Sequence, residues 1–332
     1  MSLPTVQFAG QSVGKIATGL MRLTWAPKQT PDEQAFELMR VAIKEGATFF
    51  NSGVFYGNPP DSTSNLQLIS RFCEAHPDLK DKFVLSVKGG ITAEFAPNGT
   101  IEFLREEVEK INRILKHRKM DMYEVARLDT KTGIETVMKN LLTLRDEGHF
   151  KYISLSEVAA ATIRKAASVG PVSCVEVEYS PFTTDIERNG VLDACKELNI
   201  PIAAYSPLGA GFLGNSWKSK EDIPEGDHRR HFDKFSDEHF EHNMQLVKQL
   251  EEIAKKRDVT AAQLTIAWVG QQWEGVLPLP GTTNPDRAKQ NIAAGKIRLS
   301  DDELKQIRAV IDNFDVKGVR YAKGRMSENL FA

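Results

Sequence analysis

The sequence predicts an α/β protein, a (β/α)8 TIM barrel in which residues 1–332 form a single domain. Short apolar strands alternate with amphipathic helices over most of the chain, and eight such strand–helix units can be counted. No Pro- or Ser-rich linker and no shift in composition divides the chain. A long loop after strand seven and an extra C-terminal helix are the expected additions to the barrel.

The first half of the barrel is marked by apolar runs and helix signals in turn. An apolar strand is expected at 16–19. Thr30-Pro31-Asp32-Glu33 then predicts a helix start with a threonine cap and a glutamate capping-box partner, and Gly46 ends that helix. Further strands are expected at 48–51, 83–88 and 122–128. The helices that follow them are expected at 64–76, 101–115 and 134–147.

The second half continues the pattern, with one long interruption. Strands are expected at 152–156, 174–179, 201–206 and 276–280, and helices at 159–167 and 191–198. The interruption, 209–238, is rich in Gly, Asp, His and Lys, as expected for a lid or binding loop. A pair of helices at 240–257 and 260–268 follows it, and one more helix follows Ser300.

Composition and charge exclude several classes of function. The chain is 41% hydrophobic and 27% charged, with a net charge of −2 and a pI of about 6.4. This balance offers no basic surface for nucleic acid or for an anionic membrane. The three cysteines are not closely spaced, which favours buried, reduced thiols. Because no secretory signal and no apolar run of about 20 residues is present, a cytoplasmic protein is expected.

A tyrosine and a lysine stand at the ends of two neighbouring strands. The strand at 48–51 leads into a loop that carries Tyr56, and the strand at 83–88 ends at Lys88. Because active sites in this barrel lie at the carboxyl ends of the strands, Asn51, Tyr56 and Lys88 are expected to converge. Singly, such residues usually reach water. As a pair they predict acid–base chemistry: a buried ammonium lowers the pKa of a phenol, so that Tyr56 gives a proton to a carbonyl oxygen.

Three other patterns in the sequence bear on a binding site. Residues 209–214 match G-x-G-x-x-G, but no helix opens there and no acidic strand end follows, so a loop closing on a cofactor is expected instead. After the strand at 276–280, Pro285 starts a helix and Arg287 offers a planar fork. These features predict a phosphate site, with a capped helix and a solvated arginine as the alternative. The seven histidines show no zinc-binding spacing, so no metal is expected.

Several motifs together resemble the aldo-keto reductase family over nearly the whole chain. They lie at 49–57, 87–89, 121–123, 153–156, 175–180, 205–209 and 280–283. The Tyr-Ser-Pro-Leu-Gly stretch at 205–209, taken with Pro-Gly-Thr-Thr at 280–283, is specific. The resemblance implies a nicotinamide cofactor across the barrel mouth and a small aldehyde as substrate.

The resemblance also implies a role for individual residues. Tyr56 is similar to the proton donor, Lys88 to the residue that tunes it, and Asn51 occupies a third catalytic position. The cofactor is expected to be NADPH, because Arg287 matches the group that meets the 2′-phosphate. The implied cofactor contacts are Ser156, Glu157, Glu176, Tyr205, Ser206, Leu208, Gly211, Gly281, Thr282, Arg287, Gln290 and Asn291. Trp25 and Arg127 are the expected substrate contacts.

The chain departs from the family pattern at four positions. Asn51 stands where aspartate is usual, and Ala126 where histidine is usual. Glu157 and Glu176 replace the asparagine and glutamine that hold the carboxamide. Without the aspartate, Lys88 is expected to lack an anionic partner, so that burial lowers its pKa. Without the histidine, the substrate carbonyl needs another orienting group.

These departures resemble a subgroup, the fungal pyridoxal reductases. The likeness rests on the segments 50–57, 123–127, 155–158 and 222–227. Pyridoxal carries a hydroxyl ortho to its aldehyde, and this hydroxyl is a candidate replacement for the missing histidine. The expected activity is reduction of an aldehyde, pyridoxal, to the alcohol. The alternatives are a broad-specificity aryl aldehyde or ketone reductase, and an NADPH-binding sensor or partner protein with weak catalysis.

Overall fold

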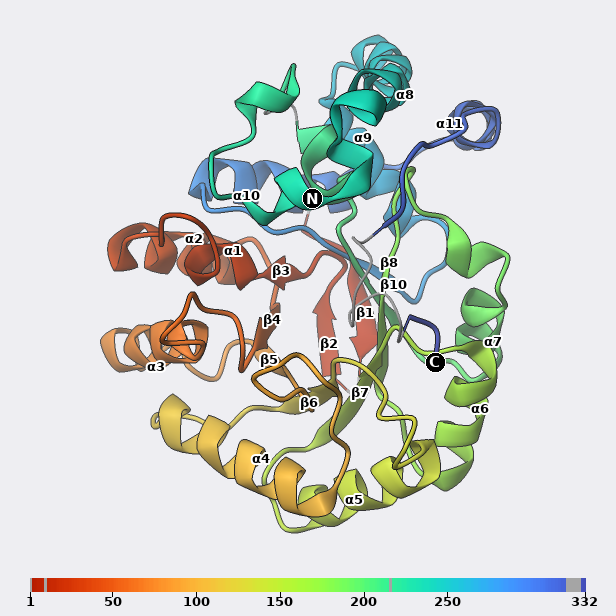
Figure 1. Cartoon of the computed structure of the whole chain (residues 1–332). Helices are drawn as coiled ribbons and strands as arrows, with labels where there is room; N and C mark the ends of the chain where they lie inside the picture. Colours follow the sequence, from red (N-terminus) through yellow and green to blue (C-terminus); the bar gives the residue numbers. More distant parts are fainter. Residues whose placement is uncertain (1, 9–10, 215–216, 321–329) are drawn as a thin grey trace.

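The computed structural model of the chain describes residues 2–8, 11–214, 217–320 and 330–332, and its strands form a barrel (Figure 1). Eight parallel strands follow one another around the barrel in sequence order. They are β3 (Thr18–Gly19), β4 (Phe49–Gly53), β5 (Val84–Gly89), β6 (Met122–Val125), β7 (Tyr152–Ser156), β8 (Cys174–Glu178), β9 (Ile202–Tyr205) and β10 (Val276–Leu279). A parallel bridge between Gly19 and Gly281 joins the two ends of the sheet. The predicted (β/α)8 fold is therefore confirmed.

Helices form an outer ring around these strands (Figure 1). Those between barrel strands include α1 (Met21–Thr24), α2 (Asp32–Lys44), α3 (Ser64–Ala75), α4 (Ile101–Leu115), α5 (Ile134–Asp146), α6 (Ala160–Val169) and α7 (Val191–Glu197). The later ones are α8 (Asp237–Lys256), α9 (Ala261–Gly270), α10 (Pro285–Ala293) and the extra C-terminal helix α11 (Asp301–Asp312). Helix α2 shows how such a helix packs: it buries Ala35, Leu38, Met39 and Ala42, which share one helical face.

The start of α2 differs from the predicted one. Pro31, not Thr30, is the N-cap residue, and no side chain caps the helix. The backbone N–H of Thr30 instead donates to the carbonyl oxygen of Leu23 at 2.8 Å, so this residue belongs to the loop after α1. Asp32 and Glu33 still place negative charge in the first turn, where the helix dipole favours it.

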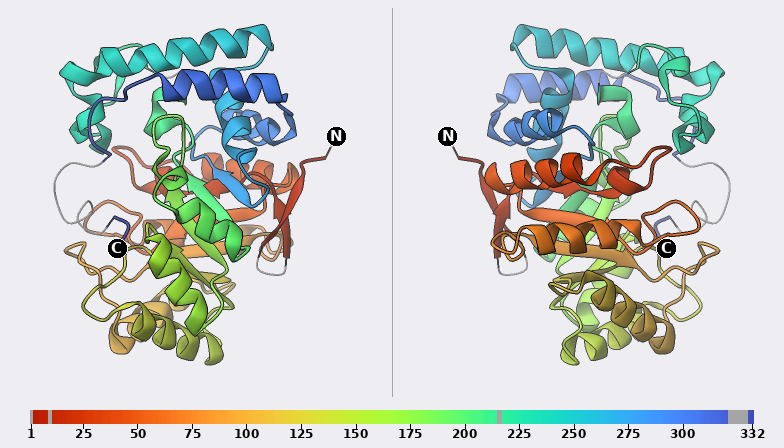
Figure 2. Two further views of the ribbon diagram at one scale, coloured as in Figure 1. Left: turned by 90° about the vertical axis from the view of Figure 1, so that its right-hand side faces the viewer. Right: turned by 90° about the vertical axis from the view of Figure 1, so that its left-hand side faces the viewer.

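An antiparallel hairpin that the sequence analysis did not anticipate precedes the barrel. It consists of β1 (Thr5–Phe8) and β2 (Gln11–Gly14). Phe8 is fully buried, and its ring centroid lies 4.6 Å from that of Phe49 at the start of β4. The hairpin thus covers the barrel at the amino-terminal end of its strands. Figure 2 shows the hairpin on the side opposite the segment that follows β9.

The predicted loop after the seventh barrel strand is present and is built from short 3-10 turns. Its turns are Gly209–Gly214, Lys220–Asp222, His228–His231 and Asp233–Phe235, while residues 215 and 216 lie outside the described part. Buried Asp227 holds this loop against α1, because its carboxylate pairs with Arg22 of α1 at 2.9 Å and with Arg229 at 2.6 Å. Gly211 has a φ of +120°, and a Cβ there would lie 2.6 Å from the Trp217 ring, so this turn requires glycine.

Across the described ranges of the chain, no helix combines the length and the apolar character that a bilayer crossing requires.

Candidate active site

A cavity of about 460 Å³ lies at the carboxyl ends of the barrel strands, under the loop that follows β9. This is the position that the sequence analysis expected for the chemistry. Most of the sequence-predicted site residues line it: Trp25, Asn51, Tyr56, Lys88, Arg127, Ser156, Glu176, Tyr205, Ser206, Leu208, Gly211 and Gly281. Closure of the barrel therefore brings together residues from almost every strand.

Tyr56 is held by the loop that follows β4. Thr24 Oγ1 donates to its carbonyl oxygen at 2.7 Å, and its own N–H donates to Gly53 at 3.2 Å. A Cβ at Gly53 would lie 2.9 Å from two carbons of the Tyr56 ring, so glycine is needed for this approach. The side chain is only 6% exposed, although it lines the cavity. Its hydroxyl interacts with the ammonium of Lys88.

The expectation that Lys88 lacks an anionic partner is wrong. Its ammonium forms an ion pair with Glu176 of β8, and Glu124 Oε1 of β6 lies 3.5 Å away. Burial alone lowers the pKa of Lys88, but the charges of these two carboxylates outweigh burial and raise it well above its ordinary value. The lysine is therefore an ammonium at neutral pH.

Asn51 connects the same two carboxylates. Its Nδ2 donates to Glu176 Oε2 at 2.6 Å and to Glu124 Oε2 at 3.1 Å. Ser86 Oγ also donates to Glu124 Oε2, at 3.1 Å. Burial, then the charge of Glu176, raise the pKa of Glu124 to about 8, against the lowering effect of Lys88. In this structure Asn51 acts on the carboxylates beneath the site, and Glu176 pairs with Lys88.

The expectation that Lys88 lowers the pKa of Tyr56 toward neutrality is also wrong. Burial is the largest influence and raises the pKa of Tyr56 to about 12. Lys88 lowers it, but Glu176 and Glu124 raise it again, because their negative charges offset the ammonium. Tyr56 is thus a phenol at neutral pH, which is the form that a proton donor requires.

Aromatic side chains form the wall of the cavity beside Tyr56. The ring of Trp25 stacks on that of Tyr56, with centroids 5.8 Å apart, and on those of Phe95 at 6.1 Å and His228 at 6.3 Å. Ala126 and Arg127, after β6, also line the cavity and are 2% and 5% exposed. A flat ring with a polar substituent fits such a wall.

The side of the cavity near Tyr205 has features that fit a nicotinamide cofactor. Ser156 is fully buried, lines the cavity, and its Oγ has no hydrogen-bond partner among the described residues. A carboxamide would satisfy this hydroxyl. Tyr205 presents its ring to the same cavity, and Ser206, Leu208 and Gly211 follow it along the wall.

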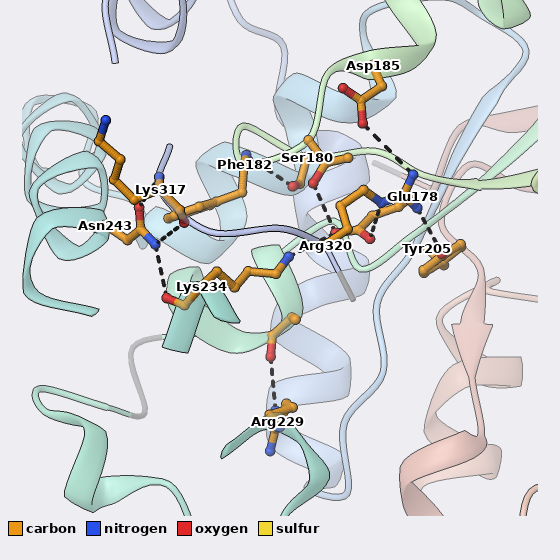
Figure 3. Close-up of polar contacts among 12 residues, drawn as sticks. Glu178, Ser180, Phe182, Asp185, Tyr205, Arg229, Lys234, Asn243, Lys317 and Arg320 are labelled. Carbon is orange, nitrogen blue, oxygen red and sulfur yellow. Dashed lines mark hydrogen bonds and ion pairs between the residues drawn. The ribbon is translucent and has the colours of Figure 1, made fainter. Parts of the chain in front are cut away.

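Glu157 occupies a different place from the cavity-lining residues. Its Oε1 accepts from Arg320 Nη2 at 2.7 Å and from the backbone N–H of Glu178 at 2.9 Å. Arg320 also pairs with Glu178 Oε2 at 3.0 Å, and Lys234 lies 3.3 Å from Glu178 Oε1 (Figure 3). Glu157 thus belongs to a network of ion pairs around Arg320, and its role as a cofactor contact stays a prediction.

The remaining predicted cofactor contacts lie beside the cavity, at the start of α10 and along it. Asn284 caps this helix by accepting from the N–H of Arg287 at 3.0 Å, and Pro285 is its first residue, as predicted. Thr282 Oγ1 accepts from the N–H of Asn284 at 3.2 Å. Gln290 is exposed and Asn291 is buried. Helix α10 therefore begins as expected, and the role of its first turn in phosphate binding stays a prediction.

Comparison with known proteins shows which protein family has this fold. The model of the aldo/keto reductase family matches residues 15–312. The chain belongs to the aldo/keto reductase family. It is accordingly an oxidoreductase, and NADP(H) is the cofactor that this family uses.

Two relatives in the fission yeast Schizosaccharomyces pombe support this membership. A protein named probable pyridoxal reductase 2 is 40% identical over 322 residues, covering 95% of this chain and 96% of that one. An aldo-keto reductase named yakc, with NADP(+) in its name, is 37% identical and covers 99% and 97%. Among solved structures, a glycerol dehydrogenase from Gluconobacter oxydans superposes with a TM-score of 0.83. It covers 98% of this chain at 20% identity, and therefore supports the fold alone.

Sequence reasoning missed several residues of this aldo/keto reductase site. One of them is Glu124, and the signal that could have found it is an ionisable residue inside a fully buried strand. Glu178, Lys234 and Arg320 also line the cavity. Nothing local in the sequence links Arg320 to these strands, because the contact depends on how the chain returns after α11.

Proposed function

We propose that this aldo/keto reductase reduces an aldehyde to an alcohol with NADPH, and that its substrate is pyridoxal. The observation that carries the proposal is the phenol of Tyr56, which lies in an aromatic-walled cavity with the Lys88 ammonium against its hydroxyl. A buried acid at the carboxyl ends of barrel strands, facing a space for a flat substrate, is suited to proton transfer onto a carbonyl oxygen.

The chain's own residues account for the proton in this reaction. NADPH, when bound, supplies the hydride of the reduction. Tyr56 gives its proton to the carbonyl oxygen, and Lys88 stabilises the phenolate that forms. The ion pair with Glu176 keeps Lys88 charged and in place. Three buried free cysteines fit a reducing compartment, so we place this reaction in the cytoplasm.

Two features of the cavity support an aldehyde of the pyridoxal type. Ala126 presents a methyl group where the substrate carbonyl would otherwise meet an imidazole, and the hydroxyl ortho to the aldehyde of pyridoxal offers an internal hydrogen bond in its place. The guanidinium of Arg127, on the same wall, suits an acidic ring hydroxyl. The name of the relative from S. pombe points in the same direction.

The test is a comparison of NADPH oxidation in three conditions: with pyridoxal, with a plain aromatic aldehyde, and without substrate. We expect rapid oxidation with pyridoxal, slower oxidation with the plain aldehyde, and little without substrate. Equal rates for both aldehydes would indicate a broad-specificity aryl aldehyde reductase. NADPH binding without oxidation in any condition would contradict the proposal and favour a sensor or partner protein.

A further inference from the structure

A group of four polar side chains, which we call the Lys88 cluster, lies beneath Tyr56. It consists of Asn51 of β4, Lys88 of β5, Glu124 of β6 and Glu176 of β8. Each is 8% exposed or less. Among the described residues, Lys88 is the cation in ion-pair contact with either carboxyl group. The cluster thus sets one positive charge against two carboxyl groups away from water.

The hydrogen-bond pattern shows which atoms are satisfied. Asn51 Nδ2 donates to one oxygen of each carboxyl group, and Lys88 pairs with the other oxygen of Glu176. Glu124 Oε1 is buried and has no hydrogen-bond partner within the described residues. The Lys88 ammonium lies 3.5 Å from this oxygen and pairs more closely with Glu176. A proton on the carboxyl group of Glu124 would make this group neutral and able to donate one hydrogen bond. Glu176 is the neighbouring carboxyl group, since Asn51 Nδ2 bridges the Oε2 atoms of the two residues.

The net charge of the Lys88 cluster also indicates that one of its two carboxyl groups carries a proton. Two ionised carboxylates and one ammonium would leave a buried net charge of −1, which a low-dielectric interior disfavours. One proton on the carboxyl pair makes the cluster neutral. Ser86 and Cys174 also face the pair of carboxyl groups, and neither adds charge. Ser86 donates a hydrogen bond to Glu124 at 3.1 Å. The pKa of the Cys174 thiol lies well above its ordinary value, because burial and the charges of Glu124 and Glu176 raise it. Burial, followed by the charge of Glu176, raises the pKa of Glu124 to about 8.

We propose that Glu124 and Glu176 share a single proton, with Glu176 as the counter-ion that holds Lys88 against Tyr56 and Glu124 as the group that keeps the cluster neutral. Both are positioning residues, since they act on Tyr56 through Lys88. Loss of the shared proton would add a negative charge behind Tyr56 and make its phenol a weaker acid. This inference rests on the proposed function, in which Tyr56 is the proton donor.

The first experiment replaces Glu124 by glutamine, which imitates its protonated form. We expect kcat of the wild type with its best aldehyde to fall as the pH rises through about 8, because deprotonation leaves the cluster negative. In Glu124→Gln the amide does not ionise, so the profile of kcat against pH should lose this fall. A variant that keeps the fall, or that loses as much activity as Glu176→Gln, would overturn the role of Glu124.

The second experiment exchanges an amide and a carboxylate that are hydrogen-bonded to each other at 2.6 Å. Glu176→Gln removes the counter-ion, and we expect kcat to fall at least about tenfold. Asn51→Asp adds a third carboxyl group and should also be impaired. The double variant Asn51→Asp/Glu176→Gln restores the total charge, with the carboxylate on β4, the strand next to that of Lys88. It should recover most of the activity lost in Glu176→Gln. A double variant that unfolds like wild type but is no more active than Glu176→Gln would overturn the role of Glu176.

An infrared measurement separates this inference from the proposed function. In the difference spectrum of wild type minus Glu124→Gln, the carbonyl stretch of a protonated carboxyl group should be present at pH 7 and decline as the pH rises through about 8. The subtraction removes the band of Glu107, whose pKa burial raises to about 7. This signal does not depend on turnover. If the band behaves as stated while no aldehyde is reduced, the proposed function fails and the shared proton stands. If the difference spectrum lacks the band at pH 7, the shared proton is refuted.

Discussion

Arg320 Nη2 donates a hydrogen bond to the hydroxyl of Tyr205 at 3.1 Å, linking the C-terminal segment to the end of β9 (Figure 3). The same guanidinium pairs with Glu157 at 2.7 Å and with Glu178 at 3.0 Å. Tyr205 lines the cavity, so a residue far along the chain contributes to the position of this ring. Arg320 therefore connects the residues that follow α11, 313–320, to the candidate cofactor site.

Arg320→Ala is expected to destabilise the protein by about 3 kcal/mol, because it leaves two buried carboxylates without this partner. The side chains of Glu157 and Glu178 are 0% and 4% exposed. The measurement is the free energy of unfolding in denaturant at pH 7. Arg188→Ala is the matched control: its side chain is 74% exposed, and its loss should change little. Equal effects of the two substitutions would contradict the importance of the buried pairs.

The destabilisation by Arg320→Ala should also depend on pH. Burial raises the pKa of Glu178, but the charges of Lys234 and Arg320 outweigh burial and hold it below its usual value. A carboxylate with a lowered pKa stabilises the fold above the pKa of the unfolded chain, about 4.3, and this stabilisation is lost as the pH falls through the lower folded value. The gap between wild type and variant should be full at pH 7 and narrow below about pH 4. A gap that widens in acid would be inconsistent with this account.

Tyr56→Phe should lower kcat by about 100-fold or more, with cofactor affinity nearly unchanged, because it removes the proton donor but keeps the ring. The assay is steady-state turnover with the best aldehyde, together with a fluorescence titration of NADPH. Tyr152→Phe is the control, since the Tyr152 hydroxyl contacts Gln11 of the hairpin at the other end of the barrel. Turnover near wild type in Tyr56→Phe would show that another group is the acid.

Arg287→Ala should weaken NADPH binding by roughly 1.5–3 kcal/mol and NADH binding much less, because only NADPH carries the 2′-phosphate. Fluorescence titration with both cofactors gives the comparison. Lys289→Ala removes an exposed positive charge from the same helix and serves as the control for a general electrostatic effect. Equal weakening of both cofactors would refute the assignment of Arg287.

Ala126→His should favour aldehydes that lack an ortho hydroxyl. If the hydroxyl of pyridoxal orients its own carbonyl, an added imidazole should raise kcat/KM for a plain aromatic aldehyde. It should leave the value for pyridoxal unchanged or lower it by crowding, because the site is shaped around a methyl group only 2% exposed. The measurement is the ratio of kcat/KM for the two aldehydes with NADPH saturating. A ratio that does not move, or that moves toward pyridoxal, would remove the main chemical argument for this substrate.

The sequence determined the barrel and the place of the chemistry. Eight apolar strands separated by amphipathic helices leave few alternatives to a closed parallel sheet, and the carboxyl ends of its strands then bring Tyr56 and Lys88 to one mouth. Helix and strand positions follow from local periodicity, so they were predictable. The hairpin at β1 and β2 was not anticipated, because its four-residue strands are too short for a clear alternating pattern.

Only the tertiary structure decided the charge around Lys88, and with it the direction of two pKa shifts. Lys88 and Glu176 are 88 residues apart and meet because the barrel closes. Sequence periodicity shows that each side chain lies in a buried strand, but it does not show which side chains face each other across the barrel. The pKa of a buried group depends on those facing charges at distances of a few ångströms. The amide at position 51 therefore suggests the loss of a counter-ion, whereas the structure places two carboxyl groups, on β6 and β8, against Lys88.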